Sequence, residues 1–225
     1  MAGKYYAVIV AGGSGSRMGG TVAKQFMTLG NKPVLAHTVE RFLAMQKVPE
    51  IIIVLPEEYK QYWKDYCFEN RLTFRHTLVS GGITRFHSVR NALSHITEPG
   101  LVAVHDGVRP FVTTSFLQDM YDLAEEHGAV VPVTEPVDSM RVRAEDGSTV
   151  ITDRSRYLMV QTPQVFSSRI LLDAYKKAYS PSFTDDASVV ESAGTKIFLA
   201  PGKMTNIKIT KPDDLVMANA LLNVF

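Results

Sequence analysis

The chain has 225 residues, of which 45% are hydrophobic, so it can bury one substantial core within a single domain spanning residues 1–225. Its 24 basic and 23 acidic residues leave a net charge of +1, which argues against a broad nucleic-acid or membrane surface. Positive charge is therefore expected only locally, around a small anionic ligand. The single cysteine, Cys67, excludes an internal disulfide framework and suits the reducing cytoplasm.

The apolar run at residues 5–11 predicts a buried central strand that opens into a glycine-rich loop. This run is too short to cross a membrane, and Lys4 precedes it without the layout of a signal peptide. The glycines allow positive φ angles and close approach to a ligand, so backbone N–H groups can converge on phosphate oxygens. Arg17 and Lys24 add positive charge, which favours a phosphate-binding loop over a plain turn between a strand and a helix.

Two better-known phosphate loops do not match the glycine-rich segment. A P-loop requires a Lys-Ser or Lys-Thr pair after its last glycine, and residues 18–21 contain neither pair. The dinucleotide fingerprint G-x-G-x-x-G, started at Gly13, would need a glycine where the chain has Met18. The segment is therefore neither a Walker loop nor a match to the dinucleotide-binding fingerprint.

Beyond the loop, apolar runs alternate with segments whose apolar residues recur at helical spacing. The predicted strands are 51–55, a run ending at Leu78-Val79, 101–105 and 129–133, and the predicted helices are a segment from Pro33 through Phe42, 57–68, 85–96, and 114–126 with Gly128 as its C-cap. This alternation predicts an α/β fold, a three-layer α/β/α, Rossmann-like, mostly parallel sheet.

The alternation of strands and helices breaks between Pro136 and Tyr157. Two short segments of alternating polarity, 140–143 and 149–152, flank Asp146-Gly147 and predict a protruding β-hairpin. The hairpin carries too many charges to bury itself in the main core. A solvated surface hairpin and an arm that contacts a second subunit are both compatible with its composition.

The last quarter of the chain returns to regular elements. A helix is predicted at 168–178, and Thr184-Asp185-Asp186 is typical of a helix N-terminus, where acidic side chains can act as caps. Closing strands are predicted at 197–199 and 207–209. The segment 210–213, with Pro212 in the first turn, predicts the start of a final helix.

Six short motifs occur in one order along nearly the whole chain. They are A-G-G-x-G-x-R-M at 11–18 followed by K-Q at 24–25, then the motifs at 79–89, 104–110, 161–166, 184–186 and 206–210. Together they resemble the family of 2-C-methyl-D-erythritol 4-phosphate cytidylyltransferases. These enzymes are the cytidylyltransferase branch of the nucleotidyltransferases that make nucleoside-diphosphate sugars and alcohols.

The resemblance implies transfer of CMP from CTP to 2-C-methyl-D-erythritol 4-phosphate, with Mg²⁺ as cofactor, in isoprenoid precursor biosynthesis. It also implies a cytoplasmic homodimer in which the hairpin at 136–157 is the dimerisation arm. Neither nucleic acid nor a membrane is expected as a partner. Ribitol-5-phosphate cytidylyltransferase remains an alternative, as does a non-catalytic nucleotide-binding module on the same fold.

In a nucleotidyl transfer, a phosphate attacks the α-phosphate of a nucleoside triphosphate and expels pyrophosphate, so the protein must supply cations and oriented dipoles. Arg17 and Lys24 are therefore the predicted catalytic residues. Asp106, at the tip of a predicted strand, is the predicted metal ligand, with a turn aspartate as the alternative. By resemblance, the nucleotide-binding residues are Ala11, Gly12, Gly13, Ser14, Gly15, Gly81, Gly82, Ser88 and Gly107, and the residues that bind the polyol phosphate are Arg109, Ser139, Arg154, Thr162 and Lys208.

Two motifs differ from those of many relatives. The chain has Gly107-Val108 where they have Ala-Ala, and Ser139-Met140-Arg141 where they have Thr-Ile-Lys. The second difference touches the polyol contact, although Ser139 keeps a hydroxyl group. The six histidines show neither H-E-x-x-H nor Cys/His ligand spacing, which argues against a transition-metal site.

Overall fold

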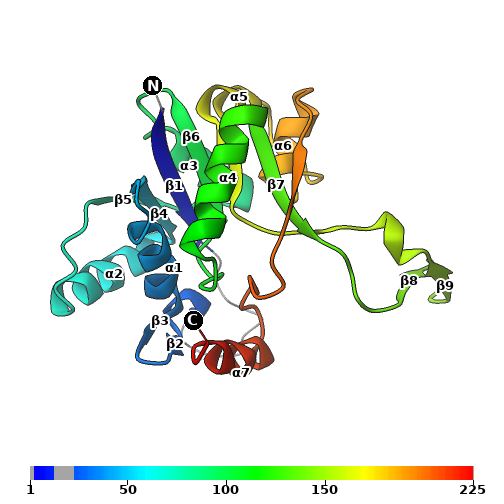
Figure 1. Ribbon diagram of the computed structural model, residues 1–225, viewed down its shortest axis with the longest axis horizontal. Coiled ribbons are helices and arrows are strands. Elements are labelled where there is room, and N and C mark those ends of the chain that lie inside the picture. Colours follow the sequence, from blue (N-terminus) through cyan, green and yellow to red (C-terminus); the bar gives the residue numbers. More distant parts are fainter. Residues whose placement is uncertain (1–2, 13–22, 225) are drawn as a thin grey trace.

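In residues 3–12 and 23–224, which a computed structural model describes, eight strands form one central sheet (Figure 1). β1 (Lys4–Val10) lies at its centre, between β4 (Glu50–Leu55) and β6 (Gly100–Asp106), and both pairings are parallel. β5 (His76–Ser80) extends the sheet beside β4, again in parallel. The predicted α/β class with a mostly parallel sheet is therefore confirmed.

The sheet becomes mixed on the other side of β6. β11 (Gln164–Ser167) runs antiparallel to both β6 and β7 (Ala129–Thr134) and lies between them. β10 (Met159–Val160) is antiparallel to the end of β7, while β12 (Phe198–Pro201) pairs with β7 in parallel. Because β11 reverses direction between them, β6 and β7 point the same way although they do not pair.

Three helices cover one face of the sheet: α1 (Val34–Leu43), α2 (Glu57–Glu69) and α4 (Thr114–His127). They pack against the odd-numbered side chains of β1, since successive strand residues point to opposite faces. Tyr121 of α4 is fully buried and its hydroxyl donates a hydrogen bond of 2.7 Å to the backbone carbonyl of Tyr6. This bond ties the helix layer directly to the central strand.

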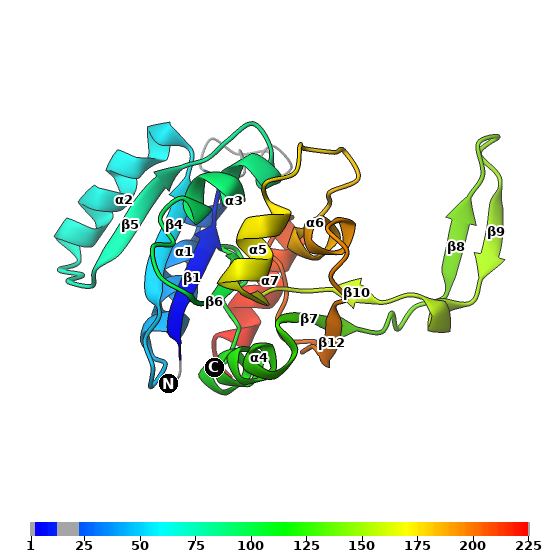
Figure 2. The same ribbon diagram turned by 90° about the horizontal axis from the view of Figure 1, so that it is seen from above.

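The opposite face is covered by α3 (Arg85–Leu93), α5 (Ser168–Ala174) and α6 (Asp186–Ser192), which pack against Tyr6 and Val8 of β1 (Figure 2). The central strands are buried on both faces, and this explains why their sequences are continuous apolar runs without polar alternation. No helix in the described part of the chain is long and apolar enough to cross a membrane.

A smaller apolar cluster holds the last helix, α7 (Pro212–Leu221), against Leu29 and Val108. Ile209 belongs to this cluster, and its N–H donates a hydrogen bond of 2.9 Å to the carbonyl of Val108. The carboxylate of Asp214 accepts hydrogen bonds from the two N–H groups that precede α7, at 2.7 and 2.9 Å. The segment before α7 is thereby fixed beside the loop that follows β6.

The predicted hairpin is present as a separate two-stranded sheet of β8 (Met140–Arg143) and β9 (Thr149–Thr152) that projects from the main body (Figure 2). Gly147 in its turn has a φ of 84°, as the Asp-Gly signal predicts. Two apolar side chains of β9, Val150 and Ile151, are 61% and 73% exposed. The hairpin therefore leaves apolar surface uncovered within this chain.

Two predicted helix ends and one predicted strand are wrong. The helix predicted to reach Ile96 ends at Leu93. Beyond it, backbone hydrogen bonds span three residues instead of four, as from the N–H of Ile96 to the carbonyl of Leu93, and form a turn. The helix predicted at 168–178 ends at Ala174 through a similar turn. No strand forms at 207–209, where the apolar residues fill the cluster around α7.

Gly100, at the start of β6, should be intolerant of any side chain. A Cβ atom at this position would lie 2.1 Å from the carbonyl oxygen of Lys4 and 2.9 Å from its carbonyl carbon. Backbone cannot move aside as a flexible side chain can, so Gly100→Ala should lower the free energy of unfolding by about 1–3 kcal/mol. Denaturant unfolding followed by circular dichroism measures this change.

Gly3→Ala is the matched control, because its Cβ would lie at an ordinary contact distance of 3.4 Å from the Cα of Gly100. This control should change the free energy of unfolding by no more than about 0.5 kcal/mol. Equal stability of Gly100→Ala and the wild-type protein would contradict the packing described for the start of β6.

Candidate active site

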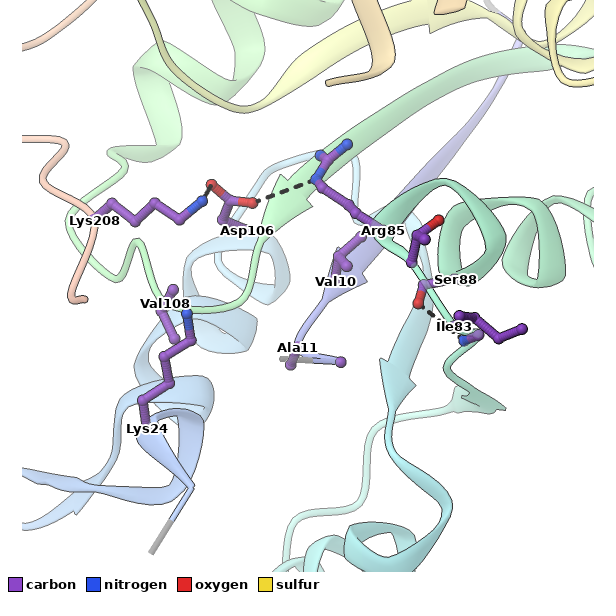
Figure 3. Close-up of a pocket in the computed structure, with 12 residues that line it drawn as sticks. Val10, Ala11, Lys24, Ile83, Arg85, Ser88, Asp106, Val108 and Lys208 are labelled. Carbon is purple, nitrogen blue, oxygen red and sulfur yellow. Dashed lines mark hydrogen bonds and ion pairs between the residues drawn. The ribbon is translucent and has the colours of Figure 1, made fainter. Parts of the chain in front are cut away.

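A cavity of about 420 Å³ lies at the carboxyl ends of β1, β5 and β6 (Figure 3). In open parallel sheets, ligands bind outside these strand ends. The predicted site residues that line the cavity are Ala11, Gly12, Lys24, Gly82, Ser88, Asp106 and Lys208. Residues that are far apart in the sequence therefore meet in one cavity.

Asp106 is the one carboxylate among the described residues that line the cavity. Its Oδ2 atom lies 3.0 Å from Nζ of Lys208, and its Oδ1 atom lies 3.9 Å from Nε of Arg85 (Figure 3). Oδ2 also lies 3.2 Å from Nε of Arg109. Burial alone would raise the pKa of Asp106, but the three cations outweigh burial and hold that pKa well below its ordinary range. Asp106 is therefore negatively charged at neutral pH.

Two residues predicted to bind the polyol phosphate, Arg109 and Thr162, are buried beneath the cavity and do not line it. Arg109 Nη1 donates a hydrogen bond of 2.7 Å to the carbonyl of Asn206. Thr162 Oγ1 accepts a hydrogen bond of 3.0 Å from the N–H of Asp106. In this arrangement, both residues fix the position of Asp106 and of the segment that carries Lys208.

His105 completes the buried layer beneath Asp106. Its Nε2 atom lies 3.1 Å from the carbonyl oxygen of Arg109, so this nitrogen must carry the proton and donate. Its Nδ1 atom then accepts a hydrogen bond of 3.1 Å from the hydroxyl of Thr162. Burial lowers the pKa of His105 to about 4, so the ring is neutral at physiological pH and adds no charge to the site.

The second glycine loop, after β5, lies against the start of α3. The N–H of Gly82 donates a hydrogen bond of 3.0 Å to Ser88 Oγ. A Cβ atom at Gly82 would lie 2.4 Å from Cβ of His87, so only glycine permits this approach. Gly81 does not line the cavity, and its N–H is bonded to the carbonyl of Leu55 at 2.7 Å. The loop therefore presents backbone groups and one hydroxyl, which suits recognition of a planar polar group.

Gly107, also predicted to bind the nucleotide, lies where the loops after β1 and β6 meet. Its N–H donates a hydrogen bond of 2.8 Å to the carbonyl of Val10. A Cβ atom at Gly107 would lie 2.9 Å from Cβ of Ala11 and 3.1 Å from Cδ1 of Leu35. This glycine therefore allows the close packing that brings Ala11 and Asp106 to the same cavity.

Three cationic side chains line the cavity in the described part of the chain: Lys24, Arg85 and Lys208. Lys24 comes from η2 (Lys24–Phe26), on the side of the cavity opposite the second glycine loop (Figure 3). Arg85 lies within the motif at 79–89, but the motif alone assigns it no role. The available signal was its position in the first turn of a helix, where the helix dipole disfavours a cation unless a carboxylate compensates it.

Six predicted site residues remain: four lie outside the described residues, and two lie on the arm. Gly13, Ser14, Gly15 and Arg17 lie outside the described residues. Ser139 and Arg154 are exposed on the arm, where the guanidinium of Arg154 donates a hydrogen bond to the carbonyl of Val137. Within one chain, the arm extends away from the main body that carries the central sheet (Figure 2).

The described residues contain no group of three or more His, Cys, Asp or Glu side chains that could hold a metal ion. Asp106 is a single carboxylate, and cations already surround it. Mg²⁺ commonly takes one or two carboxylates together with water and substrate phosphates. The donor set therefore fits an ion that arrives with a triphosphate and does not fit a resident metal centre.

Comparison with known proteins confirms the resemblance stated from the sequence. The family model for 2-C-methyl-D-erythritol 4-phosphate cytidylyltransferase matches residues 5–224. The chain is 49% identical over 219 residues to the protein of that name from Bacteroides thetaiotaomicron, covering 97% of this chain and 100% of the relative. It is 46% identical over 217 residues to that of Phocaeicola vulgatus, covering 96% and 99%.

Solved structures agree with this assignment. The 2-C-methyl-D-erythritol 4-phosphate cytidylyltransferase from Thermus thermophilus superimposes with a TM-score of 0.79 at 28% identity, covering 99% of this chain and 100% of that chain. The 4-diphosphocytidyl-2C-methyl-D-erythritol synthase from Anaerococcus prevotii superimposes with a TM-score of 0.82 at 26% identity, covering 98% and 96%. The chain belongs to the 2-C-methyl-D-erythritol 4-phosphate cytidylyltransferase family.

Proposed function

We propose that this protein transfers CMP from CTP to 2-C-methyl-D-erythritol 4-phosphate, giving 4-diphosphocytidyl-2-C-methyl-D-erythritol and pyrophosphate in isoprenoid precursor biosynthesis. The observation that carries this proposal is the cavity at the strand ends, lined by Lys24, Arg85 and Lys208. Both reactants are anionic, and this cavity offers them converging positive charge. Family membership supports the same reaction. The buried free thiol of Cys67 suits a cytoplasmic protein.

The reaction requires no covalent intermediate on the protein. The phosphate of the polyol attacks the α-phosphate in line, and negative charge increases on the transferred group and on the departing pyrophosphate. Lys24 and Arg17 stabilise this charge, and the backbone of residues 11–15 holds the triphosphate. Bound Mg²⁺ would neutralise phosphate charge, with Asp106 as a protein ligand.

Gly81, Gly82 and Ser88 form the base-recognition part of the proposed site. Cytosine presents an exocyclic amine that donates and a ring carbonyl that accepts. The N–H groups of Gly81 and Gly82 are already bonded within the protein, so the loop carbonyls can accept from the amine and the Ser88 hydroxyl can donate to the ring carbonyl. The hydrogen bond between Gly82 N–H and Ser88 Oγ holds the loop on α3 and so keeps these groups in fixed positions. Fixed polar groups reject a base with mismatched donors because buried groups would remain unpaired.

Lys208, with Arg109 and Thr162 beneath it, forms the part of the site that binds the polyol phosphate. The two remaining contacts, Ser139 and Arg154, lie on the arm and reach a cavity only if the arm crosses to a second subunit. An isolated two-stranded hairpin is marginally stable, and exposed Val150 and Ile151 offer it a surface for association. A homodimer joined through the arms meets both requirements.

The substrate assignment is tested by comparing turnover of the two polyol phosphates with CTP. 2-C-methyl-D-erythritol 4-phosphate should be turned over with a much higher kcat/KM than D-ribitol 5-phosphate, and replacing CTP with UTP should lower kcat/KM by about 100-fold or more. Pyrophosphate release measures each reaction. Preference for ribitol 5-phosphate would reassign the substrate, and CTP binding without pyrophosphate release from either would indicate a non-catalytic module.

Lys24→Ala should lower kcat much more than it weakens CTP binding. One preorganised charge donor typically contributes ~2.7–4 kcal/mol to the transition state, which corresponds to a loss of about 10²–10³-fold in kcat. Steady-state kinetics and calorimetric titration with CTP separate the two effects. Lys176→Ala, which removes a surface partner of Asp173, is the control and should behave as wild type. A near-normal rate for Lys24→Ala would refute its catalytic role.

Subunit exchange tests whether Arg154 acts in the partner's site. In a hybrid dimer of Lys24→Ala with Arg154→Ala, one site carries both substitutions and the other carries neither. Random re-pairing makes half of the dimers hybrid, so about a quarter of wild-type activity should return. Native mass spectrometry verifies the exchange. If activity stays at the level of the separate variants, Arg154 does not contribute across the dimer.

A further inference from the structure

Arg85 lies between two carboxylates, and only one of them belongs to the cavity. Its Nη2 atom is 2.7 Å from Oδ2 of Asp186, and its Nε atom is 3.9 Å from Oδ1 of Asp106. The side chain of Arg85 is 27% exposed, whereas that of Asp186 is fully buried. The guanidinium is therefore held from behind while part of it stays open to the cavity.

Asp186 does not cap α6, although the sequence motif suggested capping for the pair at 185–186. The N-cap is Asp185, whose carboxylate accepts a hydrogen bond of 2.9 Å from the N–H of Ser188. The carboxylate of Asp186 instead bonds Arg85 through Oδ2 and accepts a hydrogen bond of 2.7 Å from the hydroxyl of Tyr175 through Oδ1. A buried acid is costly unless it is paired, so these two partners account for its place in the core.

The partners of Asp186 belong to a rigid unit behind the cavity. Tyr175 is 4% exposed, and its ring stacks on that of Phe86 with centroids 4.8 Å apart. Phe86 follows Arg85 in the first turn of α3, so ring stacking joins α3 to the C-cap residue of α5, and the ion pair joins α3 to α6. This unit leaves the Arg85 side chain little freedom to leave the cavity wall.

We propose that Asp186 is a positioning residue for nucleotide binding: it holds Arg85 at the cavity wall, where Arg85 supplies a third positive charge beside Lys24 and Lys208 and orients the carboxylate of Asp106. This inference rests on the proposed function, because it assumes that CTP occupies the cavity. The link runs from the start of α6 through one arginine to the end of β6. This role explains why the carboxylate of Asp186 is buried, although neither helix capping nor metal binding requires it there.

The test is a double-mutant cycle on CTP affinity, measured by calorimetric titration with the full chain. Asp186→Asn keeps the shape of the side chain but weakens its hold on Arg85, and it should raise the dissociation constant for CTP by about 10–100-fold, the range typical of a charge-assisted hydrogen bond. Arg85→Gln should have an effect at least as large. If Asp186 acts through Arg85, Asp186→Asn should cost less than about threefold when added to Arg85→Gln.

A purely structural role gives a different result. Damage to α6 would weaken CTP binding by the same factor in both backgrounds, and such additivity would overturn the proposal. Asp185→Asn is the matched control: it changes the neighbouring acid, keeps a good N-cap residue and does not touch Arg85, so CTP affinity should stay within about threefold of wild type.

If Asp186→Asn does not fold, Arg85→Lys replaces it in the test. Lysine keeps the positive charge but lacks the planar fork that reaches two carboxylates, so CTP affinity should still fall about tenfold or more. Wild-type affinity for Arg85→Lys would overturn the proposal. Because CTP binding is the readout, the cycle remains decisive even if the polyol phosphate assigned above is wrong, whereas a wild-type protein that does not bind CTP would refute the proposed function itself.

Discussion

The architecture of the site depends on one buried carboxylate at the end of β6. Asp106 lies at the junction of three cationic side chains that come from different parts of the chain: Arg85, Arg109 and Lys208. An acid in this position could not remain charged without them, and the cations would repel one another without the acid. The mutual compensation keeps a dense group of charges ordered before any ligand arrives.

Three elements of the fold position these cationic side chains around Asp106. The start of α3 brings Arg85, the loop after β6 brings Arg109, and the tether between Ile209 and Val108 brings Lys208. Ordinary interactions fix the position of each side chain: a helix cap at α3, a glycine that permits close packing after β6, and the apolar cluster that contains Ile209. The site is therefore preorganised by the same packing that stabilises the sheet, as electrostatic catalysis requires.

Sequence patterns predicted this organisation where the cause is local. The central strands were evident because burial on both faces demands continuous apolar runs. The turn at Gly147 was evident because Asp-Gly between two alternating segments is typical of a hairpin turn, and the φ of 84° at Gly147 agrees with it. The segment 207–209 was assigned as a strand for a similar reason, but its apolar residues pack beside α7. Apolar character alone does not distinguish these two uses.

Pairings between distant residues could not be predicted in the same way. Arg85 and Asp186 are 101 positions apart, and each has a plausible local role, as a surface cation and a helix cap respectively. Their true relation appears only when α3 and α6 meet on the same face of the sheet. Lys24, Asp106 and Lys208 were predicted because motifs mark them, and in the structure all three line one cavity.

The place of β11 in the sheet has a consequence for the order of assembly during synthesis. β11 lies between β6 and β7, although it is made after β7 and after the whole arm. β5, β4, β1 and β6 can pair as soon as residues up to 106 have left the ribosome, but β7 has no neighbour on that side until residues 164–167 follow. The nascent chain must therefore hold an unpaired strand edge while it completes the arm, and the late insertion of β11 joins the two halves of the sheet.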